Sequence, residues 1–283
     1  MIALVSSAAV VITSCGTDRA PTATPTSEAS SGPTSLRYRH DVFADVEVIS
    51  DVPYQSAPAL ALDVYQPSGD TSTKRPAVIW MHGGGFAAGN KSEGVFIDFP
   101  TAFAKLGYVA VSIDYRLLVR EQCIEPFLES QQCADAASAA TEDAQTAVRF
   151  LRANATIYGI DPTRIAVAGE SAGAIAATGV GIHAHDDRDR VQAWVSFSGG
   201  AKNGDGVDGN DSPGLLIAGT ADPLVPFAWS SAVEAALEAA GVPVELRPLD
   251  GPLHVPVDQF RQLMLDDSRD FLYEHLDLAS AEQ

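Results

Sequence analysis

The stretch Arg164–Gly173, with the sequence RIAVAGESAG, constrains the fold of this chain more than any other. A short apolar run leads directly into Gly-Glu-Ser-Ala-Gly, and an alanine-rich segment with helical spacing follows. This order predicts a buried strand, a sharp turn and a helix, with Ser171 raised above the carboxyl edge of a sheet. Side chains at Gly169 and Gly173 would collide with such a turn. Ser171 is therefore the predicted nucleophile, and Glu170 beside it is expected to point away into the sheet edge as a support.

A five-residue match of this kind also arises by chance, but a second motif upstream gives it context. His82-Gly83-Gly84-Gly85-Phe86 follows the apolar run Ala77–Met81. Consecutive glycines can turn their N–H groups toward a carbonyl oxygen, although a triple-glycine turn can also be only a flexible loop. Two such motifs in this order, each directly after an apolar strand, argue against a chance match of the first motif and against a merely flexible loop at the second.

The rest of the chain alternates between strand-like and helix-like segments. Strands are expected near 42–52, 60–65, 77–81, 108–115, 193–197, 215–219 and 244–249, and helices near 94–107, 134–158, 172–183, 227–240 and 256–276. Alternation of this kind predicts an α/β fold whose mostly parallel sheet is covered by helices on both faces.

Four pieces of sequence carry a resemblance to a known family: HGGGFAAGNKSE, VAVSIDYRL, DPTRIAVAGESAGA, and IAGTADPLVP with a later histidine. They resemble the HGGG-containing esterases of the α/β-hydrolase superfamily, in its hormone-sensitive-lipase-like and acetyl- or feruloyl-esterase-like branches. The resemblance runs from about Val42 to the C-terminus. The sequence departs from the pattern where Glu170 replaces the aspartate of many relatives, and where the histidine lies in GPLHVP rather than a glycine-flanked turn.

The resemblance implies an α/β-hydrolase fold with a sheet of about eight strands and a serine ester hydrolase that needs no cofactor. It also implies an oxyanion hole formed by the N–H groups of Gly84, Gly85 and Ala172. His82 and Gly83 would support that hole.

A serine nucleophile needs a base and an acid that holds the base in the right tautomer. Ser171, Asp222 and His254 have the chain order of the resembled family, nucleophile, acid and histidine, and Asp222 and His254 each follow a predicted strand. Asp211 and Asp250 compete for the acid role, but only Asp222 directly follows the expected strand. A carboxylate before Pro223 could instead cap a helix.

Two further features raise the question of a metal. His183 and His185 lie close together, but in a charged HAHDDRD loop that reads as solvated surface. The GDGVDGND stretch suggests calcium, but its ligand spacing does not follow the EF-hand pattern. No metal is expected.

The formal net charge of −19 bears on the partners of the chain. A field of this sign repels polyanions and argues against nucleic acid and anionic membrane surfaces. The expected partner is a small-molecule ester, and the oligomeric state stays open.

The N-terminal residues suggest export. An apolar run, Ile2–Ile12, precedes Thr13-Ser14-Cys15-Gly16, which looks like a bacterial lipoprotein signal over 1–14 with Cys15 as the lipidated residue. Residues 15–35, rich in Thr, Ser, Pro and Ala, predict a disordered tether before a catalytic domain over 36–283. The expected location is the cell envelope, through a lipid anchor on the outer face of a bacterial membrane. Basic residues before the apolar run are absent, so either the true start lies elsewhere or the signal interpretation is wrong; secretion without lipid is the alternative.

The chain has three cysteines. If Cys15 takes lipid, Cys123 and Cys133 remain to close a short disulfide loop, which is worth roughly 2 to 3 kcal/mol in the chain-entropy treatment. Two free thiols in a cytosolic enzyme are the alternative. The same region, 116–132, reads equally as a lid or rim over the site and as an ordinary surface loop.

The expected function is hydrolysis of short-chain acyl or aryl esters through an acyl-enzyme. An amidase, formamidase, peptidase or acetylxylan esterase would use the same triad. A non-catalytic envelope-binding protein that retains the fold is the alternative from another class.

Overall fold

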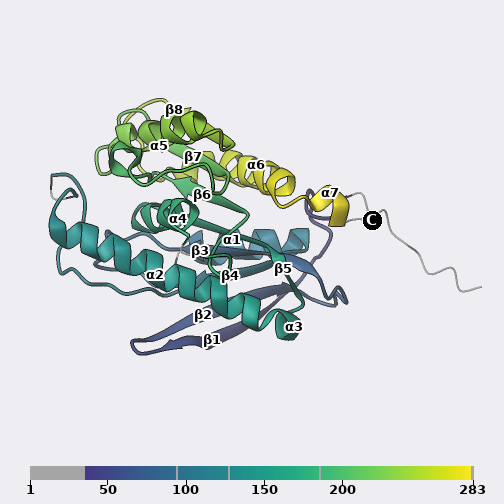
Figure 1. Cartoon of the computed structure of the whole chain (residues 1–283). Helices are drawn as coiled ribbons and strands as arrows, with labels where there is room; N and C mark the ends of the chain where they lie inside the picture. Colours follow the sequence, from purple (N-terminus) through teal and green to yellow (C-terminus); the bar gives the residue numbers. More distant parts are fainter. Residues whose placement is uncertain (1–35, 94, 127, 185, 282–283) are drawn as a thin grey trace, which may run out of the picture. The chain divides into compact units, whose positions relative to one another are not determined.

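The computed structural model describes residues 36–281 except 94, 127 and 185, so the predicted signal, Cys15 and the tether lie outside the described residues. Eight strands of the described part form one sheet in the order β1-β2-β4-β3-β5-β6-β7-β8 (Figure 1). The strands are β1 (Val46–Ser56), β2 (Ala59–Pro67), β3 (Arg75–Met81), β4 (Val109–Ile113), β5 (Ile160–Glu170), β6 (Ala193–Phe197), β7 (Gly214–Gly219) and β8 (Val244–Leu249). β1 and β2 pair antiparallel, as do β2 and β4, and all neighbours from β4 to β8 run parallel. The predicted mostly parallel sheet is confirmed.

The central strands are buried over their whole length. Every residue of β3, β4, β6 and β7 is buried, whereas most residues of the edge strand β1 are exposed. Strands that are buried on both faces are nearly continuous apolar runs, and this pattern allows them to be predicted from the sequence. Since parallel strands end at the same edge of a sheet, the loops after β3, β5, β7 and β8 meet there.

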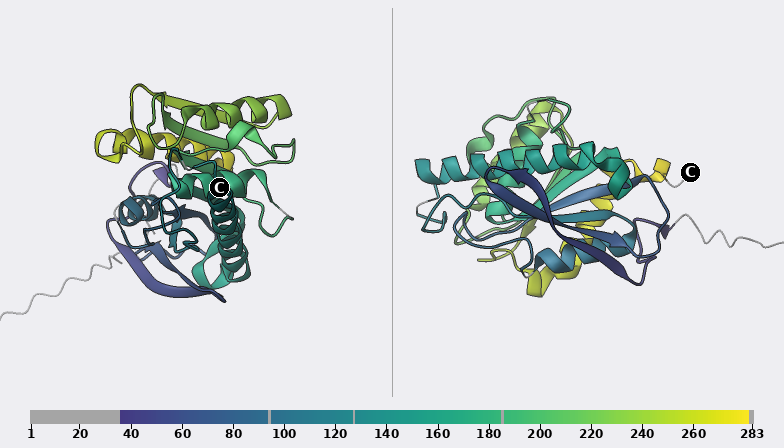
Figure 2. Two further views of the ribbon diagram at one scale, coloured as in Figure 1. Left: turned by 90° about the vertical axis from the view of Figure 1, so that its left-hand side faces the viewer. Right: turned by 90° about the horizontal axis from the view of Figure 1, so that it is seen from below.

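Helices cover both faces of the sheet. They are α1 (Val95–Leu106), α2 (Gln131–Ala153), α3 (Ala155–Tyr158), α4 (Ala172–Ile182), α5 (Phe227–Ala240), α6 (Val257–His275) and α7 (Leu278–Ala281), with a short 3₁₀ turn, η2 (Lys202–Gly204). Side chains of α2, α4 and α5 belong to one apolar cluster, and those of α1 and α6 belong to a second. Figure 2 shows helices on both sides of the sheet. The sheet therefore lies between two hydrophobic layers. No helix of the described part is long and apolar enough to cross a bilayer.

The single helix predicted over 134–158 is wrong in one respect, because the structure divides it at Asn154. The Asn154 side chain donates to the Phe150 carbonyl at 2.8 Å, and the backbone N–H of Asn154 bonds to the same carbonyl at 3.0 Å. A short polar side chain that bonds the backbone in this way competes with the helical pattern. The helix also begins before the predicted residue, since Ser130 caps it by accepting from the Cys133 N–H.

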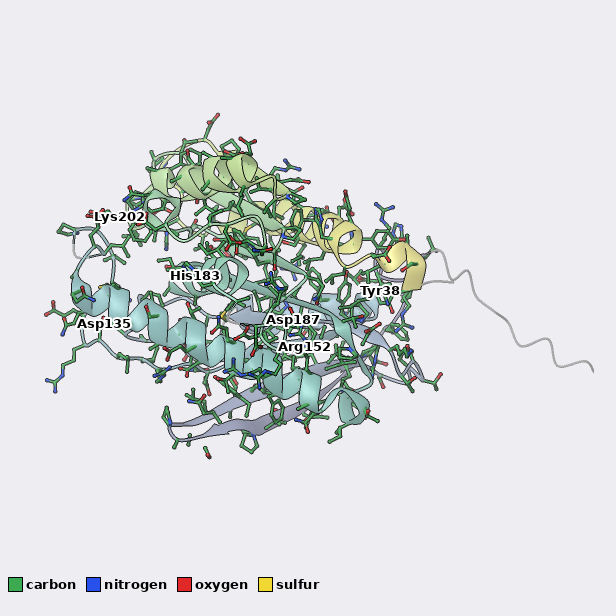
Figure 3. All side chains as sticks on the ribbon, in the orientation of Figure 1. Tyr38, Asp135, Arg152, His183, Asp187 and Lys202 are labelled. Atoms are coloured by element: carbon green, nitrogen blue, oxygen red, sulfur yellow. A yellow bond between two sulfur atoms is a disulfide. The ribbon has the colours of Figure 1, made fainter. Side chains whose placement is uncertain are left out.

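Two arginine side chains of α2 fasten residues 186–190, the charged segment before β6. Arg149 Nη1 lies 2.9 Å from Asp189 Oδ2. Arg152 donates to the carbonyls of Pro162 and Asp187, at 3.0 Å each, and Figure 3 shows Arg152 and Asp187 side by side. The same guanidinium donates to the Arg188 carbonyl at 2.5 Å. Residues 186–190 thus form a fixed connection into β6, the strand that pairs with β5.

Candidate active site

Ser171 occupies the sharp turn between β5 and α4. Its φ of 52° and ψ of −118° are a conformation that side chains rarely adopt. A Cβ added to Gly169 would lie 2.3 Å from the Gly173 carbonyl oxygen, and one added to Gly173 would lie 2.3 Å from that of Met81. Both glycines are therefore required by space, as predicted. The Ser171 N–H donates to the Phe197 carbonyl of β6 at 2.8 Å, which holds the turn against the sheet.

The structure brings together the three residues that the sequence proposed as a triad. His254 Nε2 lies 2.9 Å from Ser171 Oγ, and His254 Nδ1 lies 2.8 Å from Asp222 Oδ2. A carboxylate can only accept, so Nδ1 carries the hydrogen and Nε2 offers its lone pair to the serine hydroxyl. This arrangement can remove the serine proton during attack on a carbonyl carbon.

Asp222 is fixed by its own backbone neighbours. Its side chain is only 1% exposed, and Oδ1 accepts the N–H groups of Leu224 at 2.8 Å and Val225 at 3.0 Å. The carboxylate thus stabilises its own turn and contacts His254, but it does not cap a helix, because α5 begins at Phe227 with Pro226 as its cap residue. Of the two competitors, Asp211 accepts from the Asp208 N–H in another loop and Asp250 is exposed, and neither lines the cleft around Ser171.

The loop that carries His254 is tied to β6 by a residue that sequence reasoning missed. Ser198 is buried directly after β6, and its Oγ accepts the Val255 N–H at 2.9 Å. Val255 has a φ of 42°, and a β-branched side chain is strained there. The hydrogen bond holds this strained residue in place and so positions His254. A polar residue directly after a buried strand was the signal that could have found Ser198.

The glycine turn after β3 presents free donors to the same edge. Gly84 has φ of 105° and Gly85 has φ of 60°, and a Cβ on Gly84 would lie 2.2 Å from the Ala88 carbonyl oxygen. Among the described residues, no acceptor pairs with the N–H groups of Gly84 and Gly85. The N–H of Ala172 opens α4 and has no partner within its helix. The three predicted donors are thus all available at the edge where Ser171 lies.

His82 supports this turn from below. Its ring stacks on Tyr115 with centroids 4.2 Å apart, and its Nδ1–H donates to the Gly83 carbonyl at 2.7 Å. The Tyr115 hydroxyl donates to the His82 carbonyl at 2.5 Å. Burial lowers the pKa of His82, so the ring is held neutral as a structural donor.

Glu170 differs from its prediction. It lines the cleft with Ser171 and His254 rather than pointing away from it, although it does support the site by accepting the Gly83 N–H. Burial raises the pKa of Glu170 to about 7, against the opposing effects of the Gly83 hydrogen bond and the charge of His254. The residue before the nucleophile therefore changes its charge near neutral pH.

The cleft above Ser171 has a volume of about 640 Å³. Its walls alternate apolar side chains, among them Ile124, Leu224 and Val257, with polar ones such as Gln122 and Asp258. Within the part of the chain that the structure describes, this lining includes two carboxylates, Glu170 and Asp258, and no lysine or arginine. The cleft thus fits a neutral or cationic molecule better than an anion.

Cys123 and Cys133 form a disulfide in the structure, with Cα atoms 5.6 Å apart. The bond links the rim of the cleft to the first turn of α2. The predicted pairing is therefore present, whereas the lipidation of Cys15 stays a prediction.

The metal alternatives gain no support from the described residues. Within them, no group of three or more histidine, cysteine or acidic side chains could hold a metal ion; His185 lies outside them. In the loop around Gly206, Asp208 Oδ1 accepts the Asn210 N–H at 2.7 Å, as turn residues do.

Comparisons with known proteins agree with this architecture. The profile of the BD-FAE family matches residues 62–205, which is just over half of the chain. Human arylacetamide deacetylase-like 2 is 33% identical over 149 residues, 51% of this chain and 33% of that protein. Para-nitrobenzyl esterase of Bacillus subtilis (strain 168) is 33% identical over 129 residues, 44% of this chain and 24% of that protein. The match thus spans a third or less of the length of these curated relatives.

Among solved structures, the native esterase 2 of Thermogutta terrifontis superposes with a TM-score of 0.66 at 22% identity, over 84% of this chain and 95% of that chain. This likeness concerns the fold, and the family match concerns the region from β2 to the loop after β6, which includes the glycine turn and Ser171. The chain belongs to the BD-FAE family of α/β-hydrolases.

Proposed function

We propose that this protein is a serine carboxylic-ester hydrolase that acts on short-chain acyl or aryl esters through an acyl-enzyme intermediate. The observation that carries the proposal is the position of His254, whose two ring nitrogens lie within 2.9 Å of Ser171 Oγ and 2.8 Å of Asp222 Oδ2. Sequence relatives that bear esterase names support the same reaction class.

The proposed first step is attack by Ser171 Oγ on the ester carbonyl carbon while His254 Nε2 takes the hydroxyl proton. The carbonyl oxygen becomes an oxyanion, which the N–H groups of Ala172, Gly84 and Gly85 stabilise. When the carbon–oxygen bond to the alcohol breaks, the imidazolium gives its proton to the leaving oxygen. A water then repeats the sequence on the acyl-enzyme, with His254 as the base, and releases the acid and Ser171.

The lining of the cleft favours neutral esters of modest size. Glu170 and Asp258 would repel a carboxylate or phosphate on the substrate, and the net charge of −19 acts in the same direction. The mixed polar and apolar walls offer no continuous apolar channel for a long acyl chain. Binding energy should therefore stop growing after a few methylenes.

Hydrolysis of p-nitrophenyl esters from acetate to palmitate tests this proposal. We expect the highest kcat/KM with acetate to butyrate and a steep fall beyond hexanoate. A maximum at decanoate or longer would contradict the short-chain assignment. It would place the acyl chain instead in the apolar cavity of about 490 Å³ that Phe86, Ile175 and Trp229 help to line. No hydrolysis of any ester by the folded protein would contradict the proposal as a whole.

Glu170 gives the proposed reaction a pH dependence of its own. Its pKa is raised to about 7, so the side chain is neutral below that pH and anionic above it. The anion stabilises the imidazolium that forms on His254 during attack. Glu170→Gln stays neutral at every pH, and its kcat should match the wild type near pH 6 but fall roughly three- to tenfold behind it at pH 8.5.

The stability of the Glu170→Gln variant should change in the direction opposite to its activity. A buried carboxyl with a raised folded-state pKa binds its proton more tightly in the folded chain, so its ionisation destabilises the wild type as pH rises toward 7. The Tm of Glu170→Gln should therefore rise relative to that of the wild type between about pH 4.5 and 7, and the difference should stay constant at higher pH. A ratio of kcat values that stays constant from pH 6 to 8.5 would contradict the electrostatic role.

A further inference from the structure

The segment Gln122–Glu125 crosses the carboxyl edge of the sheet and touches two loops of the proposed active site. The Cys123 N–H donates to the Gly85 carbonyl at 2.9 Å, which belongs to the glycine turn. The Glu125 N–H donates to the Leu224 carbonyl at 3.1 Å, and the Leu224 N–H in turn donates to Asp222. We call Gln122–Glu125 the strap, since it connects the oxyanion loop to the acid loop.

The strap packs tightly against the glycine turn. A Cβ added to Gly85 would lie 2.7 Å from the Cβ of Gln122 and 3.0 Å from the Cys123 nitrogen. The side chains of Gln122 and Ile124 line the same cleft as Ser171. The strap is thus both a wall of the cleft and a direct neighbour of a predicted oxyanion donor.

The disulfide fixes the strap to the scaffold. Cys133 lies in the first turn of α2, whose cap Ser130 accepts the Cys133 N–H at 3.3 Å. Cys123 is 2% and Cys133 6% exposed, so the bond lies beneath the surface. α2 packs on α4, and Ser171 lies directly before α4. The disulfide therefore fixes the strap relative to the helix that follows Ser171.

We propose that the strap is a fixed positioning element of the active site rather than a lid, and that the Cys123–Cys133 disulfide, through the bond from the Cys123 N–H to the Gly85 carbonyl, holds residue Gly85 in its oxyanion-binding conformation. This inference rests on the proposed function. The peptide group between Gly85 and Phe86 cannot rotate while the Gly85 carbonyl accepts the Cys123 N–H. The preceding peptide group, which carries the Gly85 N–H, is held by the Gly84 carbonyl, which accepts the N–H groups of Ala87 and Ala88. Gly85 is thus fixed on both sides, and the strap supplies the contact on its carboxyl side. Such donors interact most strongly with the developing oxyanion, so their loss lowers kcat more than it raises KM.

The test is the double variant Cys123→Ser/Cys133→Ser. With p-nitrophenyl acetate we expect kcat to fall about 10- to 100-fold, less than the outright loss of one oxyanion donor, while KM changes less than about threefold. Asp70→Asn is the matched control. It breaks the pair with Arg37, in which Arg37 Nη2 lies 2.5 Å from Asp70 Oδ2 near the amino end of β3, and should lower Tm with little change in kcat.

Chemical reduction of the wild-type disulfide tests the same proposal without a mutation. Dithiothreitol transfers two electrons to the S–S bond, giving two thiols and its own cyclic disulfide. The reduced, folded protein should show the same fall in kcat, and reoxidation should restore it. If either disulfide-free form keeps wild-type kcat, the disulfide only stabilises the fold, and the proposal is wrong.

Hydrogen–deuterium exchange separates this inference from the proposed function. Peptides that cover residues 82–90 and 119–126 should exchange faster in the double variant than in the wild type, whether or not any ester is hydrolysed. Unchanged exchange in these peptides would overturn the positioning role. If the wild type hydrolyses no ester and the exchange still rises as expected, the proposed function fails while the strap remains a structural element of the glycine turn.

Discussion

Replacement of Ser171 by alanine should lower kcat on the order of 10⁶-fold, because no other hydroxyl or thiol side chain belongs to the described residues that line the cleft. Folding should be retained. Alanine keeps the Cβ that the turn already holds at φ of 52°, and the Ser171 N–H bond to Phe197 comes from the backbone. The measurement is kcat for p-nitrophenyl acetate beside a thermal unfolding curve for both proteins. Activity near that of the wild type would remove Ser171 from the mechanism.

Asp222→Asn should lower kcat by about 10⁴-fold at neutral pH, through the tautomer of His254 rather than through loss of structure. Asp222 Oδ1 accepts the N–H groups of Leu224 and Val225, so the carbonyl oxygen of an asparagine would keep that position. Its NH₂ group would then replace Oδ2, which lies 2.8 Å from His254 Nδ1. A donor there favours hydrogen on Nε2, and His254 can no longer accept the Ser171 proton.

Asp211→Asn is the matched control for this prediction. Asp211 also follows Ser171 in the chain and also accepts a backbone N–H, that of Asp208, but it lies in another loop. Its replacement should leave kcat unchanged. If Asp211→Asn loses activity and Asp222→Asn does not, the assignment of the acid is wrong.

The sequence predicted the central part of the fold well because its signals are local. A strand buried on both faces is typically a nearly continuous apolar run, and β3, β4, β6 and β7 are such runs apart from Arg75, Ser112 and Ser196. Gly169 and Gly173 were predicted for the right reason, since each leaves room for a backbone carbonyl. The break at Asn154 was missed because apolar periodicity continues across it, and only the side-chain bond to Phe150 stops the helix.

The site was predictable in its residue types but not in its supports. Chain order and the ends of strands were enough to select Ser171, Asp222 and His254. Ser198 and the strap act through contacts between segments far apart in the sequence, as in the bond from Val255 to Ser198. Glu170 was misplaced for the same reason, because its direction depends on the Gly83 N–H that reaches it from another strand end.

The glycine turn after β3, the proposed oxyanion site, shows that a sequence motif alone does not determine the conformation of its backbone. Three consecutive glycines permit many conformations, and the positive φ values of Gly84 and Gly85 become fixed only when neighbouring segments hold the turn. Two such contacts are the stack of His82 on Tyr115 and the bond from Cys123 to Gly85. The first comes from the end of β4 and the second from the strap, and neither could be read from the glycine motif itself.

The most direct test of the central claim is the mass of the protein after treatment with a fluorophosphonate, which phosphonylates an activated serine without requiring the natural ester. We expect one adduct per chain, located on the peptide that contains Ser171, with none in the Ser171→Ala variant and much slower labelling in Asp222→Asn. No adduct on the folded wild type, or an adduct on another residue that survives Ser171→Ala, would contradict the claim that Ser171 is a nucleophile activated by His254 and Asp222.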